Sequence, residues 1–569
     1  MTTSAAQAPT QGISDKRLTI AALVIFAAAF SQFFGSAIWS GLRLLAGAGG
    51  DGSLIAYIHE HVFLSMLGRA SLLNPQFYFP TRGVLGYTDA FLLNQVFYAP
   101  LRLLGVEQLL AMQLTFMLLS LVGGAFFAAL LAPFLGVRPW LAIIAAALFA
   151  FAHNLYLKSI HPQHFAIYYL PIASYLMLAS LFASRSIFAS AAVAFAGGLL
   201  LGLTFLTGLY MAWFFMFFLM FALPVFVVIQ WRVAVAFMRA NLKSVLGALA
   251  GAATGFGLGV IGVALVYLPA MSALQGITRR NFLMFPSTFR DIINVSDGNL
   301  IWGWLLRRSG LVPVHRLHNT ESHLAVTPLL VAATAVGTFL SARAAHRSEY
   351  ERFAMAVGIA GFVGFLALYV LTITIRGEWS AFFLVQEIIP GAVGIRVGFR
   401  SQVISGMFMA VAFAVVAEAF LRRERSANSS PKRRLRTTML EPAVLALGIL
   451  LVLEQVNLAS MSKFDRVAEE ALLASVPRPP SECRAFAYYN DGSRTLPALL
   501  VDAMRISQKF DVPTMNGYSG GTPPGWDLNP WKEGYMDHVK QWARDNGVAG
   551  PLCHYVEPTK TWSFIDPLR

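Results

Sequence analysis

Long apolar runs separated by short polar segments dominate this chain. Each run has about 18 or more residues and few charges, which is the length that a helix needs to cross a bilayer. About 11 such runs predict transmembrane helices, over residues 18–42, 107–131, 139–157, 164–184, 187–207, 209–230, 245–270, 323–342, 353–373, 399–421 and 438–457. The pattern therefore predicts a polytopic α-helical membrane protein.

The composition agrees with this class. Of 569 residues, 57% are hydrophobic and only 13% are charged, which excludes a soluble domain of this size. The first span has no small-residue cleavage site after it, so we expect an uncleaved helix rather than a signal peptide.

The positive charges indicate an orientation, because Lys and Arg in short loops favour the cytoplasmic side. With a cytoplasmic N-terminal segment, residues 1–17, the short basic connections all fall inside: Arg138 and the stretches 232–243, 343–352 and 422–436. The net charge of +14 then reflects topology and contact with anionic lipids, so a nucleic-acid partner is not needed.

An odd number of spans places the chain after residue 457 outside. We expect a transmembrane body over 18–457 with outer loops 43–106 and 271–322, and an extracytoplasmic domain over 458–569. The Pro-rich and Gly-rich turns of this last segment are typical of a small folded α/β domain. In the first outer loop, the stretches 54–67 and 90–104 predict two helices lying along the membrane surface.

Cys483 and Cys553 are the two cysteines of the chain, and both lie in the predicted outer domain. An oxidising compartment favours a disulfide between them, and two buried free thiols are the alternative.

Acidic side chains stand near the outer ends of several predicted spans. Asp51, in Gly50-Asp51-Gly52, could act as a base or cap the helix that begins near Ser53. Glu60 is a candidate support residue. Asp89 could orient an acceptor or cap the following helix, and Glu321 is a site residue or the partner of an arginine.

Basic side chains on the same side suggest an anion site. Arg396 and Arg400 would share one helical face if the tenth span begins early, and two guanidinium groups there could hold a phosphate. Alternatively they snorkel to lipid headgroups. His161 and His164, three residues apart in a short turn, could bind sugar or phosphate oxygens, but a histidine pair alone is weak evidence for zinc.

The predicted architecture resembles that of the GT-C superfamily of integral-membrane glycosyltransferases. The shared features are an acidic residue directly after the first span, two juxtamembrane helices, a multi-span body and an outer C-terminal domain. The short motifs that look like those of uncharacterised bacterial members are Gly50-Asp51-Gly52, His161-Pro162-Gln163-His164, residues 394–400 and residues 516–520.

The resemblance implies transfer of a sugar from a polyprenyl-phosphate donor to a glycan, lipid or other hydroxyl acceptor, with inversion, at the outer face of the bacterial inner (cytoplasmic) membrane. Asp51 would be the general base, and Arg396 and Arg400 would hold the lipid phosphate. Many members carry two acidic residues in the first loop, and no adjacent acidic pair occurs here. A divalent metal therefore stays open, and no metal ligand is assigned.

Two alternatives belong to other classes: a transporter or flippase of lipid-linked or small polar substrates, and a non-catalytic glycolipid-binding relative. The chain has no Gly-x-x-x-x-Gly-Lys-Ser/Thr phosphate loop, which argues against ATP-driven transport. In the tail, residues 516–526 could stack on an acceptor glycan or form a structural turn.

Overall fold

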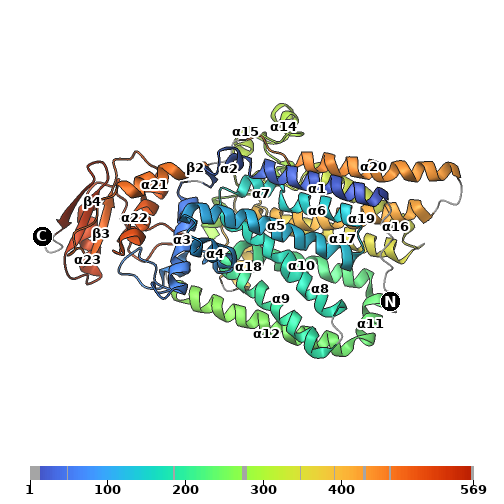
Figure 1. The fold of residues 1–569 in the computed structure, drawn as a ribbon, viewed down its shortest axis with the longest axis horizontal. Coiled ribbons are helices and arrows are strands. Elements are labelled where there is room, and N and C mark those ends of the chain that lie inside the picture. The colour runs from blue at the N-terminus through green and yellow to red at the C-terminus, as the bar shows by residue number, and fades with distance from the viewer. Residues whose placement is uncertain are drawn as a thin grey trace.

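The computed structural model describes residues 13–47, 49–183, 186–271, 279–346, 348–389, 391–426, 431–459 and 463–565. Most of residues 1–17, part of loop 271–322 and part of loop 422–436 lie outside the described residues. A bundle of long helices forms the body, and a smaller unit with a β-sheet lies at one end of it (Figure 1).

Within the described part of the chain, nine helices are long and apolar enough to cross a membrane. Their bounds are α1 Ile13–Phe33, α5 Gln108–Leu135, α6 Pro139–Ala150 continued by α7 His153–Lys158, η3 Pro162–Tyr168 continued by α8 Tyr169–Phe182, α9 Ile187–Thr207, α10 Leu209–Ile229, α12 Leu242–Tyr267, α17 Glu349–Thr372 and α19 Gln402–Ser426. The shorter helix α16, Pro328–Ala344, and helix α20, Pro431–Glu454, occupy the two other predicted spans. The helical membrane class is confirmed, and the count of 11 stays a prediction.

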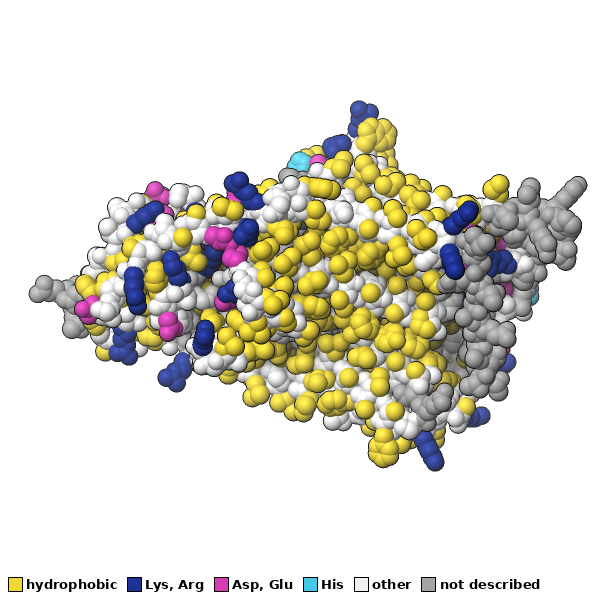
Figure 2. Space-filling model, viewed as in Figure 1, with side chains coloured by type: hydrophobic (Ala, Val, Ile, Leu, Met, Phe, Trp, Pro, Cys, Tyr) yellow, Lys and Arg dark blue, Asp and Glu magenta, His cyan; other side chains and the backbone are white. Residues whose placement is uncertain are grey.

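The outer surface of the bundle is apolar. Figure 2 shows hydrophobic side chains over the middle of the visible face, with Lys and Arg toward its two ends. Large side chains such as Phe188, Leu249 and Leu258 are more than half exposed. Water would make such a surface unfavourable, whereas lipid tails solvate it.

Helices α9 and α12 approach each other closely because glycines line their contact. A Cβ atom on Gly251 would lie 2.1 Å from the carbonyl oxygen of Ala191, and one on Gly255 would lie 2.1 Å from that of Phe195. The glycine-rich stretch of α12 thus serves helix packing, as small residues do in membranes.

Short helices connect these elements: α2 Gly35–Trp39, η1 Val84–Tyr87, η2 Leu92–Asn94, α11 Trp231–Ala240, η4 Leu268–Ala270, α13 Arg279–Leu283, η6 Phe289–Ile293, α14 Gly303–Ser309, α15 Val314–Leu317, α18 Phe382–Ile388, η7 Ala392–Gly394 and η8 Gly398–Ser401.

The first outer loop contains the two expected helices, α3 Asp51–Met66 and α4 Gln95–Leu103. However, α3 does not lie exposed on a membrane surface. Its residues 52–63 are all buried, because α3 packs against α5 in the body and against α22, Leu496–Phe510, of the C-terminal unit. The apolar side chains that suggested contact with lipid instead contact protein on several sides.

The C-terminal unit is joined to the first loop by a small sheet, in which β1 Leu44–Ala46 pairs antiparallel with β2 Lys463–Asp465. Helix α21, Arg466–Ser475, follows. Three further strands form the main sheet in the order β3-β4-β5, with β3 Ala485–Tyr489 parallel to β4 Leu552–Val556 and β4 antiparallel to β5 Thr561–Ile565.

Alternating side chains give this sheet two apolar faces. Phe486 and Tyr488 pack with α22, Leu496–Phe510. Ala485 and Ala487 point the other way, toward α23, Tyr535–Asp545. The unit is therefore a sheet between two helices, as the predicted α/β class requires, and a disulfide joins Cys483 to Cys553.

Candidate functional site

Helix α3 lies at the boundary between the bundle and the C-terminal unit (Figure 1), and Asp51 is its first residue. Its Oδ2 accepts a hydrogen bond from Nδ1 of His161 at 2.5 Å, and its Oδ1 accepts one from the hydroxyl of Tyr518 at 2.9 Å. The side chain therefore faces the body and the tail rather than capping a helix. It is 23% exposed, so the carboxylate remains within reach of other molecules.

Hydrogen bonding keeps this carboxylate charged. Burial alone would raise the pKa of Asp51, but the bonds from His161 and Tyr518 and the charge of Arg400 lower it below the ordinary value. Asp51 is therefore an anion that can accept further hydrogen bonds, since each carboxylate oxygen can accept two.

His161 joins Asp51 to a second carboxylate. Its Nε2 lies 3.4 Å from Oε1 of Glu321, while its Nδ1 is bonded to Asp51. The histidine stands between α7 and η3, where the chain turns back toward the next span. The imidazole is therefore held from both sides.

Glu321 is the centre of a buried ion cluster. Its oxygens lie 2.7 Å from Nζ of Lys158 and 2.6 Å from a terminal nitrogen of Arg400, whose Nε also donates to it at 3.2 Å. Burial opposes ionisation, but the charges of Arg400 and Lys158 hold the pKa of Glu321 well below its usual range. Of the two roles open for Glu321, the structure has it as an arginine partner within the Asp51 network.

Arg396 and Arg400 do not share a helical face, contrary to the expectation from their spacing. Helix α19 begins only at Gln402; Arg400 lies in the 3₁₀ helix η8, and Arg396 precedes it in extended backbone. Arg400 also lies over the ring of Tyr210, 5.4 Å from its centre. The short turn separates the two side chains, so one is buried against Glu321 while the other is half-buried.

Arg396 differs from its neighbour in having no acidic partner. Across the described ranges, no carboxylate forms an ion pair with its guanidinium group. Its backbone N–H donates to the hydroxyl of Tyr210, and its positive charge acts on Tyr518, the residue that binds Asp51. A cation that acts on the tyrosine bound to Asp51 is therefore available to an anionic ligand.

The remaining predicted residues form no hydrogen bond with Asp51 in the described structure. His164 is buried, and its Nδ1 donates to the carbonyl oxygen of His161, which stabilises the turn, while its Nε2 has no hydrogen-bond partner among the described residues. Glu60 accepts from Tyr98 and Arg102, which ties α3 to α4.

Asp89 caps a distant helix instead of the one that follows it. Its Oδ1 accepts from the backbone N–H of Leu209, the first residue of α10, at 3.1 Å. Burial raises the pKa of Asp89 to about 6, although this bond and Arg400 oppose the change. No pattern of residues near Asp89 indicates this contact, because Leu209 is 120 residues away in the sequence.

Tyr518 is a site residue that the sequence did not single out. The tail segment before it is anchored on the first outer loop, because Tyr78 and Phe79 donate backbone hydrogen bonds to Asn516 and Thr514. Trp526 packs against Tyr78 and donates to Met515, so it has a structural role. The run of turn residues at 516–520 marked a loop, but only its anchoring brings the hydroxyl to Asp51.

In the part of the chain that the structure covers, no group of three or more His, Cys, Asp or Glu side chains is arranged to hold a metal ion.

No protein-family model and no curated protein matches the chain. Several solved structures are similar to it. The oligosaccharyltransferase of Archaeoglobus fulgidus, tethered to an acceptor peptide, covers 95% of this chain and 68% of its own, with 13% identity and a TM-score of 0.47. ArnT from Cupriavidus metallidurans, bound to undecaprenyl phosphate, covers 88% of this chain and 85% of its own, with 14% identity and a TM-score of 0.39.

The arabinofuranosyltransferase AftD from Mycobacteria covers 91% of this chain, which spans only 32% of that protein, with 16% identity and a TM-score of 0.40. The similarity is to glycosyltransferases, the class that the sequence resembles. With TM-scores below 0.5 it carries no argument for activity or for the role of any residue.

Proposed function

We propose that this protein is a membrane glycosyltransferase that moves a sugar from a polyprenyl-phosphate donor to a hydroxyl acceptor. The observation that carries the proposal is the environment of Asp51, a partly exposed carboxylate kept ionised by His161, Tyr518 and the buried cation of Arg400. The half-buried cation of Arg396 acts on Tyr518, the tyrosine that binds Asp51. A base and a cation at one membrane boundary are what this chemistry needs.

In the reaction, Asp51 accepts the proton of the acceptor hydroxyl as its oxygen bonds to the anomeric carbon. The bond between that carbon and the phosphate oxygen breaks, and its electron pair leaves with the lipid phosphate. One displacement of this kind inverts the anomeric centre. No protonating acid is required, because phosphate leaves as a stable anion, unlike the alkoxide of a glycoside.

Each neighbouring residue has a distinct part in this proposal. Arg396 compensates the charge of the leaving phosphate, and Arg400, held by Glu321, adds to the positive field. His161 and Tyr518 orient the Asp51 carboxylate. The acceptor is a glycan, a lipid or another molecule with a free hydroxyl.

The proposed location of the protein rests on the distribution of Lys and Arg among the loops between the spans. We place the protein in the bacterial inner membrane, with residues 18–457 as the membrane body. Residues 458–569 would form an extracytoplasmic domain, and Asp51 would face the periplasm.

Purified protein incubated with a panel of polyprenyl-phosphate sugars and lipid extracts tests the proposal. We expect Asp51→Asn to lower the transfer rate by about 100-fold or more, because the amide cannot take the proton. Asp545→Asn, at the exposed end of α23, is the control and should transfer at the wild-type rate. Unchanged transfer by Asp51→Asn would reject Asp51 as the base. If the wild-type protein transferred no sugar from any donor, the alternative function of a transporter or flippase would be favoured.

A further inference from the structure

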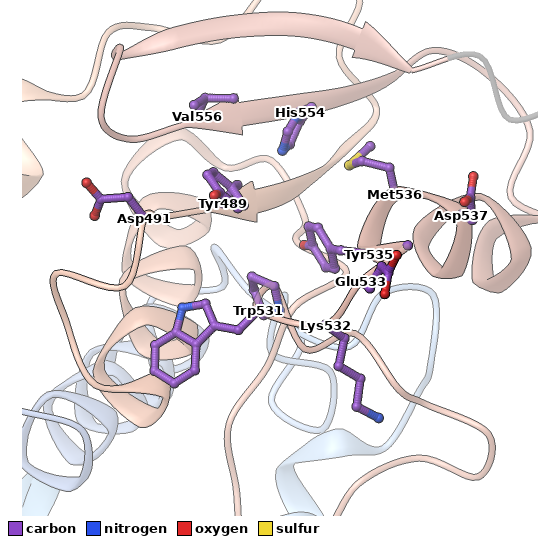
Figure 3. A pocket seen from close by; sticks show the side chains of 12 residues that line it. Tyr489, Asp491, Trp531, Lys532, Glu533, Tyr535, Met536, Asp537, His554 and Val556 are labelled. Carbon is purple, nitrogen blue, oxygen red and sulfur yellow. The ribbon is translucent and has the colours of Figure 1, made fainter.

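The C-terminal unit has a cavity of its own, separate from the Asp51 network. Its volume is about 780 Å³, and it opens beside the carboxyl ends of the parallel strands β3 and β4 (Figure 3). Tyr489 ends β3, and Val556 ends β4. Ligands of open α/β sheets commonly bind at this edge, beyond the ends of the strands.

Aromatic rings supply the apolar part of the lining. The side chain of Trp531 is 47% exposed, and Figure 3 shows its indole on the same side of the cavity as Asp491. Deeper in, the rings of Tyr489 and His554 meet edge to face with centres 6.3 Å apart. An exposed indole offers a flat apolar face, which suits the C–H face of a sugar ring.

One polar group of the lining has no hydrogen-bond partner in the described structure. Nε2 of His554 is buried and has no hydrogen-bond partner among the described residues. Burial lowers the pKa of this histidine, so its ring is neutral at pH 7. A buried nitrogen of this kind is costly unless a ligand or water completes it, and a sugar hydroxyl can do so.

The charge of the lining selects against anions. Asp491, Glu533 and Asp537 face the cavity, and Glu533 and Asp537 form no ion pair with any described residue. The one cation of the lining, Lys532, already pairs with Asp527 at 2.7 Å. Carboxylates accept hydrogen bonds from hydroxyl groups and repel phosphate, sulfate and uronate, so the charge of the lining excludes anions and suits an uncharged polyol.

Two hydrogen-bonded residues link the wall of this separate cavity to the loop that carries Tyr518. Tyr535 lines it, and the Tyr535 hydroxyl donates to the carbonyl oxygen of Tyr488 while accepting from Nδ2 of Asn516 at 3.0 Å. Asn516 lies two residues before Tyr518, which binds Asp51. A ligand seated against Tyr535 is therefore one hydrogen-bonded contact away from Asn516, at the base of the loop that reaches Asp51.

We propose that this cavity binds a neutral glycan, stacked on Trp531 and bonded to His554 and the carboxylates, and that this glycan is part of the acceptor. The assignment of this glycan as the acceptor rests on the proposed function, whereas the assignment of the cavity as a glycan-binding site does not.

The test measures binding of the full-length protein, reconstituted in lipid nanodiscs, to immobilised uncharged hexose and pentose oligosaccharides. Anionic oligosaccharides and unglycosylated peptides are the competing probes. Wild-type protein should bind a subset of the neutral chains, and Trp531→Ala should bind them about tenfold more weakly or worse. Phe564→Ala, which removes an aromatic side chain that is 57% exposed on the edge strand β5, is the matched control and should bind as wild type.

Two results would overturn the proposal: wild-type protein that prefers the anionic chains or the peptides or binds no neutral chain, or equal binding by wild type and Trp531→Ala. Asp51→Asn separates this proposal from the transferase proposal, since it should lose transfer and keep glycan binding. Glycan binding that depends on Trp531, together with normal transfer by Asp51→Asn, would reject Asp51 as the base while leaving the cavity assigned.

Discussion

Both oxygens of Asp51 are already hydrogen-bonded before any substrate binds. The donors come from different parts of the chain: His161 follows the third predicted span, and Tyr518 lies in the tail. These bonds favour the charged form, which lowers the pKa of Asp51 and keeps the carboxylate ionised at neutral pH. They also fix the orientation of the carboxylate. The same bonds make it a weaker base, because they lower its pKa.

Removing one donor should therefore move the pH profile of transfer. In Tyr518→Phe the ring stays, but the bond to the charged carboxylate is lost, so the pKa of Asp51 rises. Activity that needs the ionised form then fails at a higher pH, and the acid limb of the kcat/KM profile should move up by about one pH unit.

The control for this profile is Tyr555→Phe, since the Tyr555 hydroxyl is buried and has no hydrogen-bond partner in the described structure. Its acid limb should coincide with that of wild type. An acid limb that stays in place in Tyr518→Phe would mean that Asp51 is not the group that titrates.

At the scale of the elements, backbone contact between α9 and α12 holds one side of the bundle. The contact depends on glycine at particular turns of α12, because a methyl group at Gly255 would meet the carbonyl oxygen of Phe195. Gly257, on the same helix, has nothing within 4 Å of the place where its Cβ would be. The two glycines therefore differ only in the face that they present.

This difference predicts that the same change, from glycine to alanine, affects the stability of the protein differently at the two positions. Gly255→Ala should destabilise the protein by about 1–3 kcal/mol, because the helices must separate. Gly257→Ala should be neutral or slightly stabilising, since alanine favours the helix. Thermal unfolding in detergent measures both, and an equal effect of the two substitutions would contradict the packing.

At the scale of the whole molecule, α1 begins at one end of the bundle and the C-terminal unit lies at the other (Figure 1). The first loop, the residues around Glu321 and the tail all meet at that second end, because His161 links Asp51 to Glu321 and β1 pairs with β2. The site therefore forms only when three distant parts of the chain are on one side of the membrane.

Reporter fusions in a bacterial host check this arrangement. Alkaline phosphatase fused after residue 569 should be active, because it folds only outside the cytoplasm, and a fusion after residue 426, in the predicted cytoplasmic loop, should be inactive. The reverse pattern would place Asp51 on the cytoplasmic side and contradict the proposed use of an outward-facing lipid-linked donor.

Local patterns were enough to predict the helical membrane class, the two helices of the first loop and an α/β unit at the end of the chain. Apolar length and turn residues act over a few neighbours, so they can be read from the sequence directly. The candidate role of Asp51, which stays a prediction, was proposed in the same way, from a carboxylate beside the end of a span.

The partners of Asp51 were decided by the tertiary structure. Glu321 bonds Arg400, 79 residues away, and Tyr518 reaches Asp51 across 467 residues of chain. The spacing of Arg396 and Arg400 suggested a shared helical face, but the chain forms a 3₁₀ turn there and only Arg400 is buried against a carboxylate. A hydrogen bond or ion pair depends on distances between whole elements, and no pattern of neighbouring residues contains those distances.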